Sequence, residues 1–261
     1  MANLIDTHFH LNHYRNYREL AAKISELAQY TICVTNSPGV FLSCKKTIPE
    51  SKYLKFAIGF HPLDEGLGTT DLRDFLYLLD RTNYVGEIGL DYANSTKMSR
   101  EAQIHYFEPI VAKCASENKL MTVHIRKAEK DAIEIFRKHT PRKCIIHWFS
   151  GSEKQMQEFL DIGCYFSINS NMVISKNNQK YLRIPADRIL VESDGPYTKV
   201  NGKRYTPELL CQSYMLIADF YGLPNLASIV HSNLRTILET ACSSQRVVPT
   251  FKTSQNSTET F

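Results

Sequence analysis

The fold of this chain is constrained above all by a regular alternation between short apolar segments and segments with helical periodicity. Eight apolar segments have the length of strands, at residues 4–8, 31–35, 54–60, 84–90, 120–125, 143–148, 164–168 and 188–192. Most are rich in Ile, Val, Phe and Tyr. Their nearly continuous hydrophobicity is typical of strands that are buried on both faces of a parallel sheet.

Helices are predicted between these strands. Residues 17–29 carry Leu20, Ile24 and Leu27 on one helix face, and residues 71–80, 100–118 and 226–241 are predicted as helices too. Pro109 is expected to kink or interrupt the helix over residues 100–118, because proline removes a backbone donor.

Several residues mark helix ends. Ser152 and Gln155 resemble a capping box, and Gly163 suits the far end of the same helix. Pro207 stands at the first position of another predicted helix. The pattern after residues 31–35 is only weakly helical, so we expect seven or eight clear strands.

Strands that are each followed by a helix predict an α/β protein, and the number of strands makes a TIM (β/α)8 barrel the first choice, distorted if only seven strands are clear. No internal repeat or linker divides the chain, so we expect a single domain over residues 1–242. Residues 243–261 turn polar and are expected to form a frayed tail.

Composition sets broad limits on location and partners. The net charge of +4 is compatible with phosphate-bearing substrates, although ordinary surface lysines explain it as well. The seven cysteines include no C-x-x-C pair, which excludes a zinc knuckle and favours reduced thiols. Without a signal-peptide pattern or an apolar run of roughly 18 residues, we expect a cytoplasmic protein with no membrane span.

Side chains of the kind that bind metals lie at or near the carboxyl ends of six predicted strands, the first, third, fourth, fifth, sixth and eighth. They are His8, His10, His61, Glu87, Asp91, His124, His147 and Asp194. A single histidine at a strand end is more often structural. Together, however, these residues would form one ring, because the active sites of TIM barrels lie at the carboxyl ends of the strands. The sequence therefore predicts a metal site.

The first strand gives the sharpest local prediction. His8 and His10 are two residues apart, so both side chains point to the same face of an extended strand. Asp6 shares that face and is expected to orient one of the imidazoles. His13 belongs to a basic and aromatic segment over residues 12–18, which is expected to be mainly surface but is the best candidate for contacting nucleic acid.

The remaining histidines fall in helical segments and are expected to be structural; they are His105, His139 and His231.

Six motifs surround the candidate ligands, in the order DTHFHL (6–11), GFHP (59–62), VGEIGLDY (85–92), VHIRKA (123–128), IHWFSGS (146–152) and VESDGPY (191–197). Together they resemble the TatD family of metal-dependent deoxyribonucleases. The resemblance covers roughly residues 3 to 240 and implies two divalent metal ions, Mg²⁺, Mn²⁺ or Zn²⁺, in a TIM barrel.

The same resemblance implies a role for each ligand. His8, His10 and Asp194 would hold one ion, and Glu87 would bridge it to a second ion.

The second ion would be held by His124 and His147, while His61 and Arg126 would lie close to the substrate phosphate. Asp194 is the candidate general base, because a ligand carboxylate can also accept a proton from the attacking water. Glu87 and Asp194 are therefore the predicted catalytic residues.

The chain departs from the family pattern at a few positions. Lys127 stands where an acidic residue is usual, and Tyr205-Thr206-Pro207 replaces the customary Asn-Glu-Pro. These positions are expected to lie in loops around the site, where they bear on substrate preference.

Two further departures lie beside the first and last motifs. Asn12 replaces an aspartate, and Gly195 replaces a usual serine. None of the departures removes a predicted metal ligand.

We therefore expect a hydrolase of ester bonds, a deoxyribonuclease that acts on single-stranded DNA or on DNA ends. One alternative is an amidohydrolase for a small amide, lactone or ester, although no lysine is placed to serve as a carboxylated bridging ligand. Another is a subunit of a larger assembly, such as an antiviral defence system, whose activity depends on protein partners.

Overall fold

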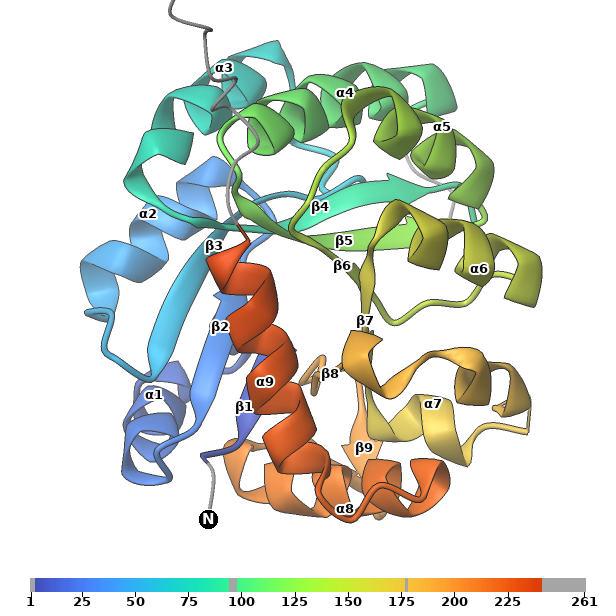
Figure 1. The fold of residues 1–261 in the computed structure, drawn as a ribbon. Coiled ribbons are helices and arrows are strands. Elements are labelled where there is room, and N and C mark those ends of the chain that lie inside the picture. Colours follow the sequence, from blue (N-terminus) through green and yellow to red (C-terminus); the bar gives the residue numbers. More distant parts are fainter. Residues whose placement is uncertain (1–2, 94–97, 177, 241–261) are drawn as a thin grey trace, which may run out of the picture.

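Eight parallel strands form one sheet in the order β1 to β8 in the computed structural model, which describes residues 3–93, 98–176 and 178–240 (Figure 1). The strands are β1 (Ile5–Phe9), β2 (Tyr30–Val34), β3 (Leu54–Phe60), β4 (Tyr84–Asp91), β5 (Leu120–Arg126), β6 (Cys144–His147), β7 (Tyr165–Ile168) and β8 (Ile189–Val191). Every neighbouring pair is parallel. The predicted TIM barrel is confirmed, with all eight strands.

The barrel is nearly closed where β8 meets β1. The backbone N–H of Asp194 donates to the carbonyl of His8 at 2.8 Å, and that of His10 donates to Gly195 at 3.0 Å. The hydroxyl of Thr7 donates to the carbonyl of Val191 at 3.1 Å. These bonds hold the carboxyl ends of the first and last strands together, and the candidate ligands lie at these ends.

Helices alternate with the strands and cover the outside of the barrel (Figure 1). They are α1 (Tyr17–Glu26), α2 (Pro38–Thr47), α3 (Thr69–Leu78), α4 (Arg100–Ser116), α5 (Glu129–His139), α6 (Glu153–Ile162), α7 (Ser170–Ile174), α8 (Leu210–Tyr221) and α9 (Leu226–Glu239). A short ribbon, β9 (Lys199–Val200) and β10 (Lys203–Arg204), lies between β8 and α8.

Local signals explain where helices begin and end. The weakly helical segment after β2 does form α2, because Ser37 caps it by accepting the N–H of Val40 at 3.3 Å. The capping box of α6 and its C-cap Gly163, at φ 97°, are confirmed. The interruption expected at Pro109 is wrong, since α4 runs through it. Phe107, Ile110 and Val111 beside this proline are buried, and packing of this kind contributes most of the stability of helices in proteins.

Helix α9 covers the end of the barrel at which the strands begin (Figure 1). The side-chain amide of Asn233 donates to the carbonyls of Ala186 and Ile189, at 2.8 and 2.7 Å, just where β8 starts. The Lys143 ammonium, before β6, donates to the carbonyl of Leu238 at 2.6 Å. With this end covered, the opposite end is the one open to a substrate.

Two expectations concern the chain as a whole. The predicted domain end at residue 242 and the tail over residues 243–261 lie outside the described residues. Across the described ranges, no helix has both the length and the apolar character that a membrane span needs.

Candidate metal centre

Two glycines let the strands that carry the site approach closely. A Cβ atom on Gly59 in β3 would lie 1.5 Å from the carbonyl oxygen of Thr35, which accepts the backbone N–H of Glu87 at 2.8 Å. A Cβ atom on Gly89 in β4 would lie 1.9 Å from the carbonyl oxygen of His124. Only glycine fits at such contacts, so these residues allow Glu87 and His124 to meet.

Glu87 lies at the centre of the site, and each of its carboxylate oxygens faces a different group of histidines. Oε2 lies 3.2 Å from Nε2 of His10 and 3.5 Å from Nε2 of His8. The same two nitrogens lie 3.4 and 3.7 Å from Oδ1 of Asp194. The structure thus brings together the residues predicted to hold the first ion.

The other oxygen of Glu87 faces the second group. Oε1 lies 3.0 Å from Nδ1 of His124, 3.3 Å from Nε2 of His61 and 3.6 Å from Nε2 of His147. Burial alone would raise the pKa of Glu87, but the surrounding histidines hold it well below its usual range. A carboxylate is therefore present at the centre of the site.

Hydrogen bonds orient His8 and His147 towards the centre. Nδ1 of His8 lies 3.0 Å from the hydroxyl of Thr122, and Nδ1 of His147 lies 2.9 Å from the buried carboxylate of Glu192. When Nδ1 carries the proton, the lone pair on Nε2 points into the site, as metal coordination requires. His147 also lies near the Asp194 cluster, so its assignment to the second ion stays a prediction.

His124 and His61 differ in what their inner nitrogens can do. Nε2 of His124 lies 3.0 Å from Asp91, which leaves the lone pair of Nδ1 facing Glu87. In His61, Nδ1 accepts the N–H of Leu63 at 3.2 Å, so Nε2 carries the proton in the neutral ring. In this tautomer His61 offers a donor to the site. The spacing of His61, Glu87 and His124 would also suit a metal ion, so the phosphate contact of His61 stays a prediction.

The expectation that Asp6 orients an imidazole is wrong. Its Oδ1 accepts the N–H groups of His8, at 3.2 Å, and Ser193, at 2.9 Å, while Oδ2 accepts the hydroxyl of Tyr205 at 3.2 Å. Backbone donors at the β1–β8 seam compete better for this carboxylate than a distant ring. Burial raises the pKa of Asp6 to about 7.

Two imidazole-orienting residues were missed by the sequence analysis, Thr122 and Glu192. Thr122 carries no signal of its own, because nothing in a strand threonine points to a histidine far away in the sequence. Glu192 carried one: a carboxylate at the end of a fully apolar strand needs buried partners. It accepts the hydroxyl of Ser167 and the side-chain amide of Asn169 in addition to binding His147.

The spacing of the inner atoms fits a metal ion. Ligands about 2.0–2.2 Å from a tetrahedral ion are about 3.3–3.6 Å from one another. The Nε2 atoms of His8 and His10 lie 3.3 Å from each other and 3.2–3.7 Å from Oε2 of Glu87 and Oδ1 of Asp194. Oδ1 of Asp194 is buried and has no hydrogen-bond partner among the described residues. A cation would satisfy this oxygen.

A cavity of about 500 Å³ opens over these residues. Most of the candidate ligands line it, and Arg126, Trp148 and Tyr197 form another part of its wall. Arg126, the predicted phosphate contact, is exposed there at the end of β5. A cavity of this size and polarity is large enough for a nucleotide-sized ligand.

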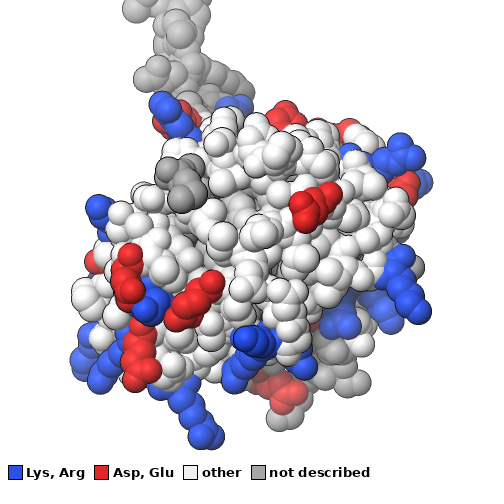
Figure 2. Space-filling model, turned by 90° about the horizontal axis from the view of Figure 1, so that it is seen from below, with Lys and Arg blue, Asp and Glu red and all other residues white. Residues whose placement is uncertain are grey.

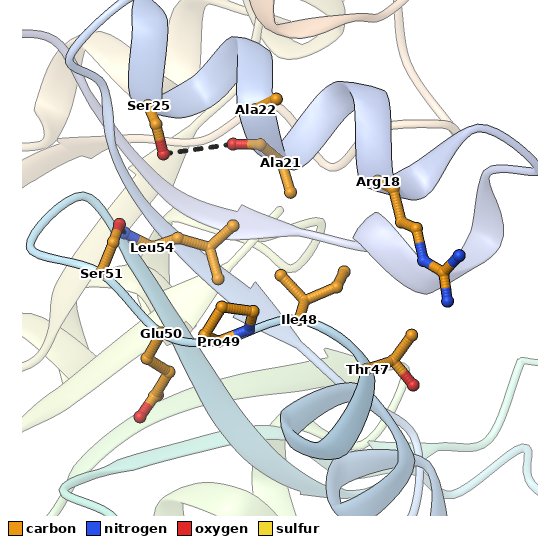
Figure 3. Close-up of a pocket in the computed structure, with 10 residues that line it drawn as sticks. All are labelled: Arg18, Ala21, Ala22, Ser25, Thr47, Ile48, Pro49, Glu50, Ser51 and Leu54. Carbon is orange, nitrogen blue, oxygen red and sulfur yellow. Dashed lines mark hydrogen bonds between the residues drawn. The ribbon is translucent and has the colours of Figure 1, made fainter.

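A second hollow, of about 340 Å³, lies between α1 and the segment that precedes β3 (Figure 3). Its lining is mainly aliphatic, and its one carboxylate, on Glu50, is already bound to the N–H of Phe56 at 2.8 Å and to Lys45 at 3.0 Å. This hollow lacks the side chains for hydrolytic chemistry.

The outer side of the barrel around α1 and α8 carries its charged side chains mainly towards its margins (Figure 2). Within α8, only Asp219 is charged. This side therefore does not offer a dense basic surface, and the cavity over Glu87 is the better candidate site.

The histidines outside the predicted ligand set have different surroundings. His139 contacts Glu108 at 3.0 Å, and His105 and His231 are exposed on helices. In the segment over residues 12–18, Arg15 and Arg18 are exposed as expected, but His13 packs against the site itself.

Comparisons with known proteins agree with this geometry. The family model described as TatD related DNase matches residues 5–239. The uncharacterized metal-dependent hydrolase YcfH of Escherichia coli (strain K12) is 27% identical over 256 residues, covering 88% of this chain and 93% of that protein. Deoxyribonuclease Tat-D of Schizosaccharomyces pombe is 30% identical over 119 residues, covering 44% of this chain and 38% of that protein.

Among solved structures, the TatD homolog YJJV of Escherichia coli has the same fold, with a TM-score of 0.79 at 21% identity over 90% of this chain and 97% of that one. The family match spans the whole barrel and includes every predicted ligand. The chain therefore belongs to the TatD family and is a metal-dependent hydrolase.

Proposed function

We propose that this hydrolase cleaves phosphodiester bonds of DNA and removes nucleotides from single-stranded ends. The observation that carries the proposal is the position of Glu87, whose two oxygens face two separate groups of histidines. Such a carboxylate can bridge two cations, and two cations side by side suit the in-line displacement at a phosphodiester.

The metal ions and the protein side chains would each contribute to hydrolysis. Two divalent ions, when bound, would polarise the phosphodiester and lower the pKa of the attacking water. Asp194, whose carboxylate lies beside His8 and His10, would accept the proton of that water. The Nε2–H of His61 and the guanidinium of Arg126 would bind the non-bridging oxygens of the phosphate.

The alternative of an amide, lactone or small ester substrate has less support. An amidohydrolase that bridges its metals with a carboxylated lysine needs that lysine in the cavity wall. Glu87 would fill the bridging role instead, and no lysine is among the residues described around the cavity. A partner-dependent form of the nuclease remains compatible with the same site, and it predicts weak activity of the isolated chain.

The test is degradation of single- and double-stranded DNA, labelled at either end, by the purified protein with Mg²⁺, Mn²⁺, Zn²⁺ or EDTA. An RNA of the same sequence runs beside it. Glu87→Ala and Asp194→Asn should each lower the rate by at least ~100-fold, while the surface variant Glu158→Gln keeps it. Full activity in Glu87→Ala, or intact DNA in every lane while metal is bound, would refute the proposal.

A further inference from the structure

Tyr197 is a large aromatic side chain at the mouth of the cavity that the hydrolytic steps do not use. It follows Asp194 by three residues and is 58% exposed, although it lines the cavity. An aromatic ring with an exposed face can stack on a nucleic-acid base, because every base has a π-face. Tyr197 is therefore a candidate for substrate binding.

His13 fixes the position of this ring. The hydroxyl of Tyr197 lies 2.8 Å from Nδ1 of His13. The His13 ring is in turn stacked on His10, with ring centroids 4.8 Å apart and planes 10° apart. The rings of His10 and His13 lie nearly perpendicular to the tyrosine ring, with centroids 5.4 and 5.7 Å from its own, so they hold it in place while 58% of the side chain stays exposed. A ring that is held in place loses little conformational entropy when a ligand stacks on it.

Positive charges lie next to this ring. The ribbon begins at Lys199, two residues after Tyr197, and its second strand carries Lys203 and Arg204, all exposed. The Arg204 guanidinium lies over the ring of Tyr14, 4.9 Å from its centroid, which places the ribbon beside the segment that carries His13. A basic strip beside an aromatic ring is the combination that binds single-stranded nucleic acid.

We propose that Tyr197, anchored by His13, forms a stacking face for the unpaired nucleobase next to the scissile phosphodiester, with the β9–β10 ribbon contacting the adjoining phosphates. This proposal rests on the proposed function, and it identifies an unpaired nucleobase as the part of the DNA that Tyr197 binds. A base inside a duplex already has both faces covered by its neighbours, so this surface would restrict the reaction to single strands and frayed ends.

The first experiment measures binding of a short single-stranded DNA to the full-length, Mn²⁺-loaded protein. The DNA carries a terminal 2-aminopurine, whose fluorescence falls on stacking, and phosphorothioate linkages that slow cleavage. Tyr197→Ala should weaken binding by about 5- to 100-fold, as expected for one lost base–aromatic stack, and should abolish the quenching. Tyr197→Phe keeps the ring and should lose less than about threefold.

Tyr77→Ala is the matched control, since Tyr77 is 69% exposed on α3 and does not line the cavity. It should bind like the wild type. Equal binding and quenching by Tyr197→Ala and the wild type would overturn the inference, as would the absence of any binding by the wild type.

The second experiment compares hydrolysis of a normal DNA end with that of an end whose terminal residue is abasic. Tyr197→Ala should lower kcat/KM for the normal end by about 5- to 100-fold, and most of that penalty should disappear on the abasic end. An equal penalty on both ends would overturn the stacking face. If the wild type binds and quenches through Tyr197 yet hydrolyses no DNA, the proposed function fails while the stacking face stands.

Discussion

The substitution Gly195→Ala tests whether the seam behind Asp194 is as tightly packed as the structure indicates. A Cβ atom at Gly195 would lie 2.5 Å from Cδ1 of Tyr205, 2.6 Å from the hydroxyl oxygen of Tyr14 and 3.0 Å from Cε2 of Phe9. Gly195 is not among the glycines with positive φ, so its backbone would accept a side chain. The obstacle to a side chain at this position is therefore the three neighbouring rings.

These rings cannot easily move aside. Tyr205 is 1% exposed and donates its hydroxyl to Asp6, while Tyr14 donates its hydroxyl to the carbonyl of Tyr205 at 2.6 Å. Inserting a methyl group into such a packed region costs about 1–3 kcal/mol, and the contacts at Gly195 place it in the upper part of that range. For a domain of this size, Tm should fall by roughly 2–4 °C for each kcal/mol.

The assay is urea denaturation followed by circular dichroism, with Gly39→Ala as the matched control. Gly39 lies in α2 and a Cβ atom there would meet no atom within 4 Å, so this variant should be neutral or slightly stabilising. If Gly195→Ala is as stable as the wild type, the packing argument is refuted.

A second substitution sharpens the test. The resemblance to the TatD family implies serine at position 195 and asparagine at position 205, and Tyr205→Asn removes the ring that a side chain at Gly195 would meet first. We expect the double variant Gly195→Ser with Tyr205→Asn to be more stable than the sum of the single effects by about 0.5–3 kcal/mol. Additive effects would show that the two positions are not coupled.

Three further outcomes are expected. Burial lowers the pKa of His147, but the Glu192 and Asp194 carboxylates outweigh it and raise the pKa to about 10. If His147 binds the metal, metal uptake at pH 8 should release a proton, and the affinity for the metal should fall as the pH is lowered below about 10. The proton release is measured by calorimetry in two buffers of different ionisation enthalpy. Equal binding heats in the two buffers would contradict it. Glu192→Gln should weaken metal binding by about 10- to 100-fold in a chelator competition. Asn233→Ala, which frees the carbonyl of Ile189, should lower the free energy of unfolding in urea by about 1–3 kcal/mol.

The sequence predicted the barrel because each strand carries its own signal. A buried parallel strand must be apolar on both faces, so each of the eight segments could be recognised without knowing its neighbours. The ligands followed from the barrel, since its topology brings the carboxyl ends of the strands together. Several strand ends differ from the prediction by one or two residues. The strand β8, for example, covers Ile189–Val191 where residues 188–192 were expected, and Glu192 just beyond it binds His147.

Contacts between distant residues were beyond the sequence. Thr122 is 114 residues from the His8 ring that it orients, and a lone strand threonine gives no sign of such a partner. The ribbon, in contrast, had a readable signal. Asn201 and Gly202 form its turn with φ angles of 50° and 77°, and an Asn-Gly pair is a strong hairpin indicator.

The departures from the family pattern gain meaning from their positions in the structure. Gly195 and Tyr205 pack against each other at the β1–β8 seam, where Tyr205 donates its hydroxyl to Asp6. Substitution of the predicted metal ligands would abolish hydrolysis. The departures at positions 195 and 205, in contrast, change the packing next to Asp194 and leave every predicted ligand in the sequence. The ribbon and Tyr197 adjoin the same seam, so changes here would act on what the site binds and not on how it hydrolyses.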